Sequence, residues 1–425
     1  MKKIVYFIAL FGLMVSNQLI AKTLPPQSKP LSLAQAVSLA HQEKPSLFSA
    51  TEDIAVKRAE EKQAYSSYLP NITASAELSH DTNAGDSNEG LPASVLTIDA
   101  RSTFFDMTKA GAQKAAHFYV KAAHAQRNDT SNKIRYETET AFLSAWLLQK
   151  KVELIDLQKE IAELHFVQAA TKKELALIDS TAFEAAILTK EKELALVTEY
   201  TNEYNNAKAV LEKTIGISIT TPLEWNPHHA LVIPSLERCL TNAKLFRQDL
   251  QKNKYDTAAS TQRYNQTCWE LCPKGTAFAT LAHASETDLG ENYTRGTTLN
   301  AGLKLNWALF DGTNYIFERD RRDALRLKSI LDTNSLALDI KAEVETAYND
   351  FCISKKELTP KNEAFKKAQL DFKAKELQYQ TGLLSSLEFK TAFYTFKTIE
   401  FEWITAIVGV ALKETLLNYR CGYPR

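Results

Sequence analysis

Hydrophobic and polar side chains alternate strictly in one stretch of the second half of the chain. Over residues 297–309 the apolar positions are Leu299, Ala301, Leu303, Leu305, Trp307 and Leu309, and polar or small residues fill the positions between them. A period of two residues places successive side chains on opposite faces of an extended backbone. The pattern therefore predicts a β-strand with one apolar face and one polar face.

The same alternation predicts three further strands, at about 70–80, 94–105 and 274–284. Runs of roughly 10 to 12 residues match a tilted strand that crosses a bilayer, and membrane barrels alternate lipid-facing with lumen-facing side chains. A strand of a soluble sandwich alternates too, so one strand alone would favour the soluble alternative. Repetition of the pattern favours the barrel. The predicted lumen-facing residues are Thr73, Ser75, Glu77, Thr97, Asp99, Arg101, Asn300, Lys304 and Asn306.

Aromatic side chains gather where these strands meet helical stretches. The ones that we expect at a membrane interface are Tyr68, Phe104, Phe105, Trp269, Trp307 and Phe310. Amphipathic rings at one level are typical of such an interface, although the same rings could close the end of a helical bundle. Four strands are too few for a barrel, since single-chain barrels begin at about eight strands. An open edge cannot lie in lipid, so the strands predict an oligomer that shares one barrel.

Helical periodicity fills most of the remaining sequence. We expect helices at about 46–67 and 235–268, and a very long one over 108–174, which lacks proline and would measure roughly 100 Å. Its leucines and the aromatic residues of the closing helix from Phe389 to Leu417 follow a heptad, which predicts coiled-coil seams. Pro360 predicts a kink or a break in the second long helix.

The two halves of the chain repeat each other. The stretch PNITASAELSH from Pro70 matches PKGTAFATLAH from Pro273, and ETAF from Glu139 matches ETAY from Glu345. The order of predicted elements is also the same in both halves, so we interpret the chain as a tandem repeat. The predicted segments are a first repeat over 31–220, a linker over 221–234, a second repeat over 235–420 and a tail over 421–425.

The first residues have the pattern of a secretory signal. Lys2 and Lys3 precede an apolar run over 4–15, and a polar stretch follows that ends with Leu19, Ile20 and Ala21. We expect a signal peptide over 1–21, cleavage after Ala21 and a linker over 22–30. No cysteine lies near the predicted cleavage site, which argues against a lipid anchor. No later apolar run reaches the roughly 18 residues that a membrane-spanning helix requires.

Charge and candidate chemistry exclude several classes of protein. The 51 basic and 51 acidic side chains balance, which argues against nucleic-acid binding. Cys268 and Cys272 could be half of a metal site, a local disulfide or apolar filler, and we assign no metal because no second ligand pair accompanies them. The sequence has no phosphate-binding glycine loop and no nucleophile elbow, so we expect neither catalysis nor a cofactor.

Several motifs, in order along both halves, resemble those of the outer membrane efflux protein family, the TolC-like channels of Gram-negative bacteria. They are LSLAQAVSLAHQEKPSLFSA from Leu31, SYLPNI from Ser67, FFDMTKAG from Phe104, LFDGT from Leu309 and YQTGLLSSLEF from Tyr379. The resemblance implies a mainly α protein with a small β part. Three chains would form an α-barrel of long coiled-coil helices, continued by a 12-stranded membrane β-barrel with four strands from each chain. It further implies an outer-membrane channel-tunnel with a large periplasmic part, docked on a periplasmic adaptor and an inner-membrane pump, in efflux or type I secretion.

The resemblance also implies a gate at the periplasmic tips. Its residues here would be Tyr379, Gly382, Glu388 and Asp179, with Glu388 in the acidic ring of the family. The sequence departs from the family pattern at Leu384, Thr391, Ala176 and Ala182, which puts gating by ion pairs in question. An ordinary solvated role for Glu388 is the alternative. For the chain as a whole, the alternative is a periplasmic coiled-coil adaptor or scaffold without a membrane barrel.

Overall fold

The computed structural model describes residues 30–80, 92–226, 234–287 and 293–423. The predicted signal peptide, most of the N-terminal linker and the tips of both strand loops lie outside these residues. The chain divides into two compact units. The sheet unit comprises the described parts of residues 46–130, 237–344 and 421–425, and the hairpin unit those of residues 1–45, 131–236 and 345–420.

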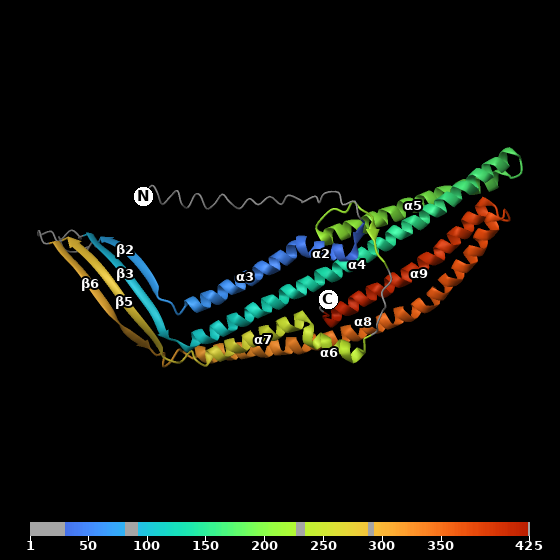
Figure 1. Ribbon diagram of the computed structural model, residues 1–425. Helices are drawn as coiled ribbons and strands as arrows, with labels where there is room; N and C mark the ends of the chain where they lie inside the picture. The colour runs from blue at the N-terminus through green and yellow to red at the C-terminus, as the bar shows by residue number, and fades with distance from the viewer. Residues whose placement is uncertain (1–29, 81–91, 227–233, 288–292, 424–425) are drawn as a thin grey trace. The chain divides into compact units, whose positions relative to one another are not determined.

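Four antiparallel strands form the sheet of the sheet unit (Figure 1). They are β2 (Asn71–His80), β3 (Pro92–Phe105), β5 (Lys274–Thr287) and β6 (Tyr293–Asn306), in the order β2-β3-β5-β6. Each begins and ends within a few residues of the range that alternation predicts. The central pair, β3 with β5, joins the two sequence repeats.

The register of the strands separates large apolar from polar side chains in the middle of the sheet. Ile98 lies opposite Leu281, and Leu281 lies opposite Leu299, so large apolar side chains line up on one face. One residue along each strand, Asp99 lies opposite Thr280, and Thr280 lies opposite Asn300 on the other face. Because successive side chains point to opposite faces, a slip of one residue would exchange the two sets.

Two glycines in the sheet are covered by aromatic rings from the neighbouring strand. A Cβ at Gly275 would lie 2.6 Å from the ring of Phe104, which sits at a break in register between Thr103 and Phe105. On the opposite face, a Cβ at Gly302 would lie 3.1 Å from the ring of Phe278, directly across the ladder. In both places glycine leaves room for a ring to lie flat on the sheet.

In each half of the chain, helices of the sheet unit precede the first sheet strand of that half. α3 (Pro45–Ser66) leads into β2, and α6 (Leu236–Phe246) with α7 (Gln248–Thr267) leads into β5. The prediction of a single helix over 235–268 is therefore wrong.

The break between α6 and α7 lies at Arg247, which has an extended backbone. Its buried guanidinium is ion-paired with Asp249 at 3.0 Å and with Glu343 at 2.6 Å.

Four long helices pair in the hairpin unit. α4 (Met107–Glu174) and α8 (Asn314–Gln380) begin in the sheet unit, and α5 (Ser180–Ile215) and α9 (Ser386–Cys421) follow them after short turns. α4 has 68 residues and α8 has 67, whereas α5 and α9 have 36 each. The duplication of the sequence is thus a duplication of helical hairpins.

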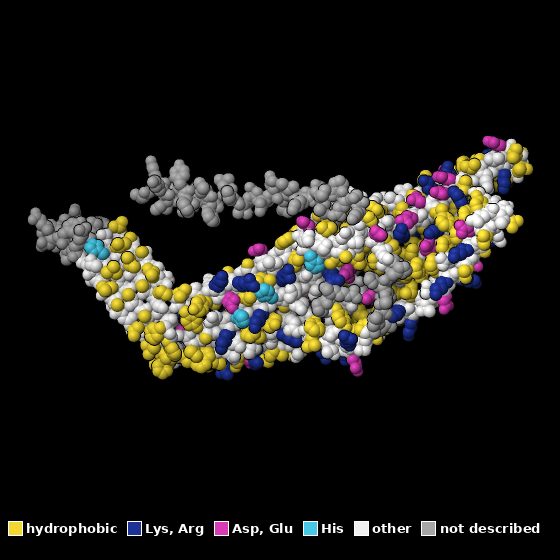
Figure 2. Space-filling view, in the orientation of Figure 1, with side chains coloured by type: hydrophobic (Ala, Val, Ile, Leu, Met, Phe, Trp, Pro, Cys, Tyr) yellow, Lys and Arg dark blue, Asp and Glu magenta, His cyan; other side chains and the backbone are white. Residues whose placement is uncertain are grey.

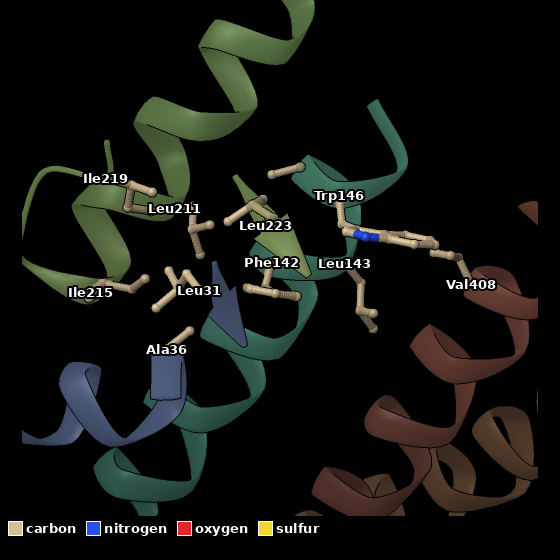
Figure 3. Close-up of a cluster of buried hydrophobic side chains, with 11 residues drawn as sticks. Leu31, Ala36, Phe142, Leu143, Trp146, Leu211, Ile215, Ile219, Leu223 and Val408 are labelled. Atoms are coloured by element: carbon tan, nitrogen blue, oxygen red, sulfur yellow. The ribbon is translucent and has the colours of Figure 1, made fainter. Parts of the chain in front are cut away.

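A cluster of buried apolar side chains holds the hairpin unit together (Figure 3). It gathers Phe142, Leu143 and Trp146 from α4 with Leu211 and Ile215 from α5. The short parallel pair β1 (Leu31–Ser32) and β4 (Leu223–Glu224) adds apolar side chains, and α2 (Leu33–Glu43) adds Ala36. In this cluster the first described residues and the residues after α5 pack on the long helices.

Pro360 does not break the second long helix, because α8 runs through it from Asn314 to Gln380. A proline in a helix removes one hydrogen bond and costs about 3 kcal/mol. Contacts with α9 on the same stretch offset this cost. Lys361 pairs with Glu402 at 2.6 Å, and the rings of Phe365 and Trp403 stack at 4.4 Å. Tertiary packing therefore overrides the local preference of proline.

Within the described residues, none of the helices combines the length and the apolar character required to span a bilayer.

Candidate functional site

The polar face of the sheet carries every residue that we predicted to face a lumen. Thr73 pairs with Asp99, Ser75 with Thr97, and Thr280 with Asn300 along the ladders. Their neighbours in register on the same face are Glu77, Arg101, Lys304 and Asn306. The Thr280 hydroxyl donates a 2.5 Å hydrogen bond to Asp99, while Arg101 lies 3.7 Å from the same carboxylate and extends into solvent. This face is polar and carries charges of both signs.

The opposite face of the sheet is apolar and exposed (Figure 2). Its large side chains are Ile72, Leu78, Leu96, Ile98, Leu281, Leu299, Leu303 and Leu305. Their exposure runs from 40% for Leu281 to 87% for Leu78, and Leu299 in the central row is 73% exposed. Soluble monomers rarely leave so continuous an apolar surface in water, so this face is suited to contact with an apolar medium or partner.

The edge strands β2 and β6 have no partner on their outer side among the described residues. An edge of ten or more residues with free N–H and C=O groups is a template for pairing with another strand. Charged residues, which often protect such edges, are few in these strands: Glu77 in β2, and Arg295 and Lys304 in β6.

The predicted interface aromatics lie at the end of the sheet that meets the helices. Phe104 and Phe105 end β3, and Tyr68 and Trp269 lie in the turns that precede β2 and β5. Trp307 and Phe310 follow β6, which ends at Asn306 and not at 309 as predicted. The indole N–H of Trp307 donates a 3.0 Å hydrogen bond to the carbonyl of Leu271, and Phe310 is 80% exposed. Aromatic rings therefore gather at this end of the sheet.

The two helical hairpins turn in the same way at their far ends. Leu383 N–H donates to Gln378 O at 2.9 Å, and Leu177 N–H donates to Lys172 O at 2.8 Å. In each turn, the residue just before the donor has a positive φ: Gly382 at 76° and Ala176 at 55°. This is a Schellman motif, in which glycine is the usual residue at the left-handed position. The first hairpin thus holds alanine in a conformation that favours glycine.

The strained alanine gives a testable expectation. Ala176→Gly should stabilise the first turn by about 1 kcal/mol, because alanine pays a steric penalty in the left-handed region that glycine does not. Gly382→Ala, the reciprocal change in the second turn, should destabilise that turn by a similar amount. Hydrogen–deuterium exchange of the turn peptides should report opposite changes of about fivefold. Equal responses of the two turns would contradict the assignment of strain.

The two acidic tip residues both cap helices. The Asp179 carboxylate accepts hydrogen bonds from Ala182 N–H at 2.9 Å and from the Thr181 hydroxyl, and these bonds lower its pKa. The Glu388 carboxylate accepts from the backbone N–H of Ser385 at 2.9 Å and from its hydroxyl, which lowers the pKa of Glu388. Ser385 and Glu388 form a capping box at the start of α9. Both carboxylates therefore remain ionised at neutral pH and at mildly acidic pH.

Tyr379 belongs to a seam of aromatic rings between α8 and α9. Its ring stacks on Phe389 at 4.4 Å, and Phe372 lies 5.0 to 5.8 Å from Phe389, Phe393 and Phe396. The heptad in α9 predicted half of this seam. The other half, Phe365, Phe372 and Tyr379, recurs at seven-residue spacing in α8 and was missed, although the spacing is visible in the sequence.

Potential metal ligands are dispersed in the part of the chain that the structure describes. It holds no cluster of three or more potential metal ligands. Cys268 and Cys272 are thiols, the first exposed and the second half-buried.

No model of a protein family and no curated protein matches the sequence. Solved structures do match. The chain is similar to the CmeC outer membrane channel of Campylobacter jejuni, with 13% identity over 92% of this chain and 85% of that chain and a TM-score of 0.75. A crystal structure of CusC matches with 13% identity over 92% of both chains and a TM-score of 0.73.

The open state of the MtrE outer membrane channel of Neisseria gonorrhoeae matches with 14% identity, over 92% of this chain and 88% of that chain, and a TM-score of 0.72. Likeness at this low identity concerns the fold. The long helical hairpins and the four-stranded sheet of this chain are thus the fold seen in outer membrane channels.

Proposed function

We propose that the chain is the outer-membrane channel-tunnel of a tripartite efflux or type I secretion system. The observation that carries the proposal is the four-stranded sheet, which has one polar face, one exposed apolar face and two edges without a partner strand among the described residues. A surface of this kind is suited to the wall of a pore in lipid. The fold shared with outer membrane channels supports the same role.

The unpaired edges argue for an oligomer. In hydrocarbon each free backbone N–H or C=O costs several kcal/mol, so a sheet in lipid must close on itself. Four strands cannot close, but three copies supply twelve, which lies within the range of membrane barrels. In this homotrimer β6 of one copy pairs with β2 of the next, apolar side chains contact lipid, and the polar face lines the lumen.

The helical hairpins would continue the channel into the periplasm. Their turns would form the end that meets a periplasmic adaptor and an inner-membrane pump, as the resemblance to the efflux family implies. The cargo would be small toxic molecules or proteins passed on without chemical change. In this role the protein needs no catalytic residue, metal or cofactor.

A periplasmic adaptor is the second candidate, since coiled-coil hairpins are common to both. The exposed apolar face of the sheet disfavours it, because burying such a face in lipid is favourable and leaving it in water is not. Extraction separates the two: the channel should remain with outer membranes until detergent is added, whereas an adaptor without a barrel should dissolve in aqueous buffer. Purified protein should also give small, gated conductance in planar bilayers. A water-soluble protein without conductance would contradict the proposal.

The role of Glu388 can be tested without disturbing the turn. Glu388→Gln keeps the hydrogen bonds of the capping box and removes the charge. If three copies of Glu388 form a ring at the narrow end, cation preference in planar bilayers should fall. Glu388→Ala, which also removes the cap, should in addition destabilise the start of α9 by about 1 kcal/mol. Unchanged selectivity in Glu388→Gln would leave Glu388 as a helix cap alone.

A further inference from the structure

The last residues of the described chain pack directly on the helix α6. Gly422, which follows α9, has a φ of 66°, and a Cβ there would lie 2.9 Å from the backbone nitrogen of Arg247 and 3.0 Å from the carbonyl carbon of Phe246. So close an approach of two backbones fixes the end of α9 against the end of α6. Any side chain at position 422 would push them apart.

This approach brings two cysteine side chains together. Cys239 lies in α6, two helical turns before Phe246, and Cys421 is the last residue of α9. Both side chains are fully buried, with 0% exposure, and their thiols are hydrogen-bonded to each other. The remaining cysteines, Cys268, Cys272 and Cys352, are exposed or half-buried.

We propose that Cys239 and Cys421 form a disulfide in the exported protein. The oxidant is the disulfide of a thiol–disulfide oxidoreductase. The thiolate of one cysteine attacks it to give a mixed disulfide, and the second cysteine displaces the enzyme's thiol. Two thiols of this chain lose two protons and two electrons, and the enzyme's disulfide is reduced to two thiols. Compartments outside the cytoplasm favour this reaction, so the inference rests on the export that the proposed function requires.

The timing of the reaction follows from burial. Burial raises the pKa of the Cys421 thiol, and the nearby Cys239 adds to the effect. A thiol with a raised pKa rarely ionises and reacts slowly. The bridge therefore forms while the end of α9 is still docking on α6, before both sulfurs are shielded. Once formed, it is protected from reductants by the same burial, and it ties the end of α9 to α6 covalently.

The test uses the full chain, exported and purified from membranes, with Cys268→Ser, Cys272→Ser and Cys352→Ser combined so that only the pair remains. Unfolded in denaturant without reductant, this variant should take up no alkylating reagent, and after dithiothreitol both thiols should react. Its mass before reduction should be lower by two hydrogen atoms. The natural chain, alkylated and digested in the same way, should yield the same linked peptide, so the answer does not depend on the folding of the variant.

A matched control adds Cys421→Ser to that variant, and its single remaining thiol should react without reductant. Two reactive thiols in the unreduced pair variant, together with no linked peptide from the natural chain, would overturn the proposal. The outcome is separable from channel function. A chain that carries the bridge but forms no channel contradicts the proposed function only, and a conducting trimer with two thiols contradicts the disulfide only.

Discussion

Leu299→Arg should prevent assembly of the protein in the outer membrane, whereas Asn300→Arg should not. The two positions are neighbours in β6 and point to opposite faces of the sheet. Leu299 stands in the central row with Ile98 and Leu281, so arginine there would enter hydrocarbon. Asn300 stands in the row of Asp99 and Thr280, where arginine would enter the polar face.

The expected penalty is large. Arginine on the lipid face of a membrane barrel costs about 2–4 kcal/mol at the midplane. A homotrimer carries the substitution three times, so the total approaches or exceeds the free energy by which a typical domain is stable. We expect most of the Leu299→Arg chain to be lost from the outer membrane fraction or to run as a monomer.

The measurement is the amount of trimer extracted by detergent from outer membranes, compared between the two variants and the natural chain. Asn300→Arg is the matched control, since it introduces the same side chain one residue away. Equal assembly of the two variants, or loss of Asn300→Arg alone, would show that the faces are assigned wrongly.

Phe372→Ala should open the second helical hairpin. The ring contacts Phe389, Phe393 and Phe396 at once, and its removal leaves a gap in the middle of the seam between α8 and α9. Removing a fully buried phenylalanine costs about 3–5 kcal/mol. Phe372 is half-buried, so we expect roughly 2–3 kcal/mol for this ring, part of it from aromatic contacts.

Hydrogen–deuterium exchange of peptides from α8 and α9 measures this opening directly. A loss of roughly 2–3 kcal/mol corresponds to about 30- to 150-fold faster exchange. Lys373→Ala, at the exposed neighbouring position, is the control and should leave exchange almost unchanged. A similar effect of both variants would mean that the seam does not hold the hairpin closed.

The strands could be predicted closely because their signal is local. A side-chain period of two needs no knowledge of partners, and the polar set from Thr73 to Asn306 falls on one face of the sheet as the alternation requires. The order β2-β3-β5-β6 required the structure, since alternation does not tell which strand lies next to which.

The errors arise where tertiary contacts override local preference. Pro360 stays within α8 because the ion pair of Lys361 with Glu402 and the stacking of Phe365 on Trp403 hold the turns that follow it against α9. Arg247 interrupts the helix predicted over 235–268 because carboxylates from Asp249 and Glu343 surround its buried guanidinium. Glu343, Glu402 and Trp403 lie far in the sequence from the residues that they contact, so a local pattern does not reveal these contacts.

The turns at the tips of the hairpins could be predicted in part. Duplication places Ala176 and Gly382 at equivalent positions, 206 residues apart, and the shared turn follows from that equivalence. The capping role of Glu388 depends on Ser385 three residues earlier, which the sequence also contains. A role of Glu388 in a pore depends on contacts with other copies of the chain, so it cannot be predicted from the sequence of one chain.

The central claim is that three copies join their open sheet edges into one barrel in lipid. Native mass spectrometry of the natural protein, extracted from outer membranes in detergent, tests it most directly. We predict a complex of three chains that falls apart only when the protein unfolds. A single chain of native structure, stable in aqueous buffer without detergent, would contradict the claim.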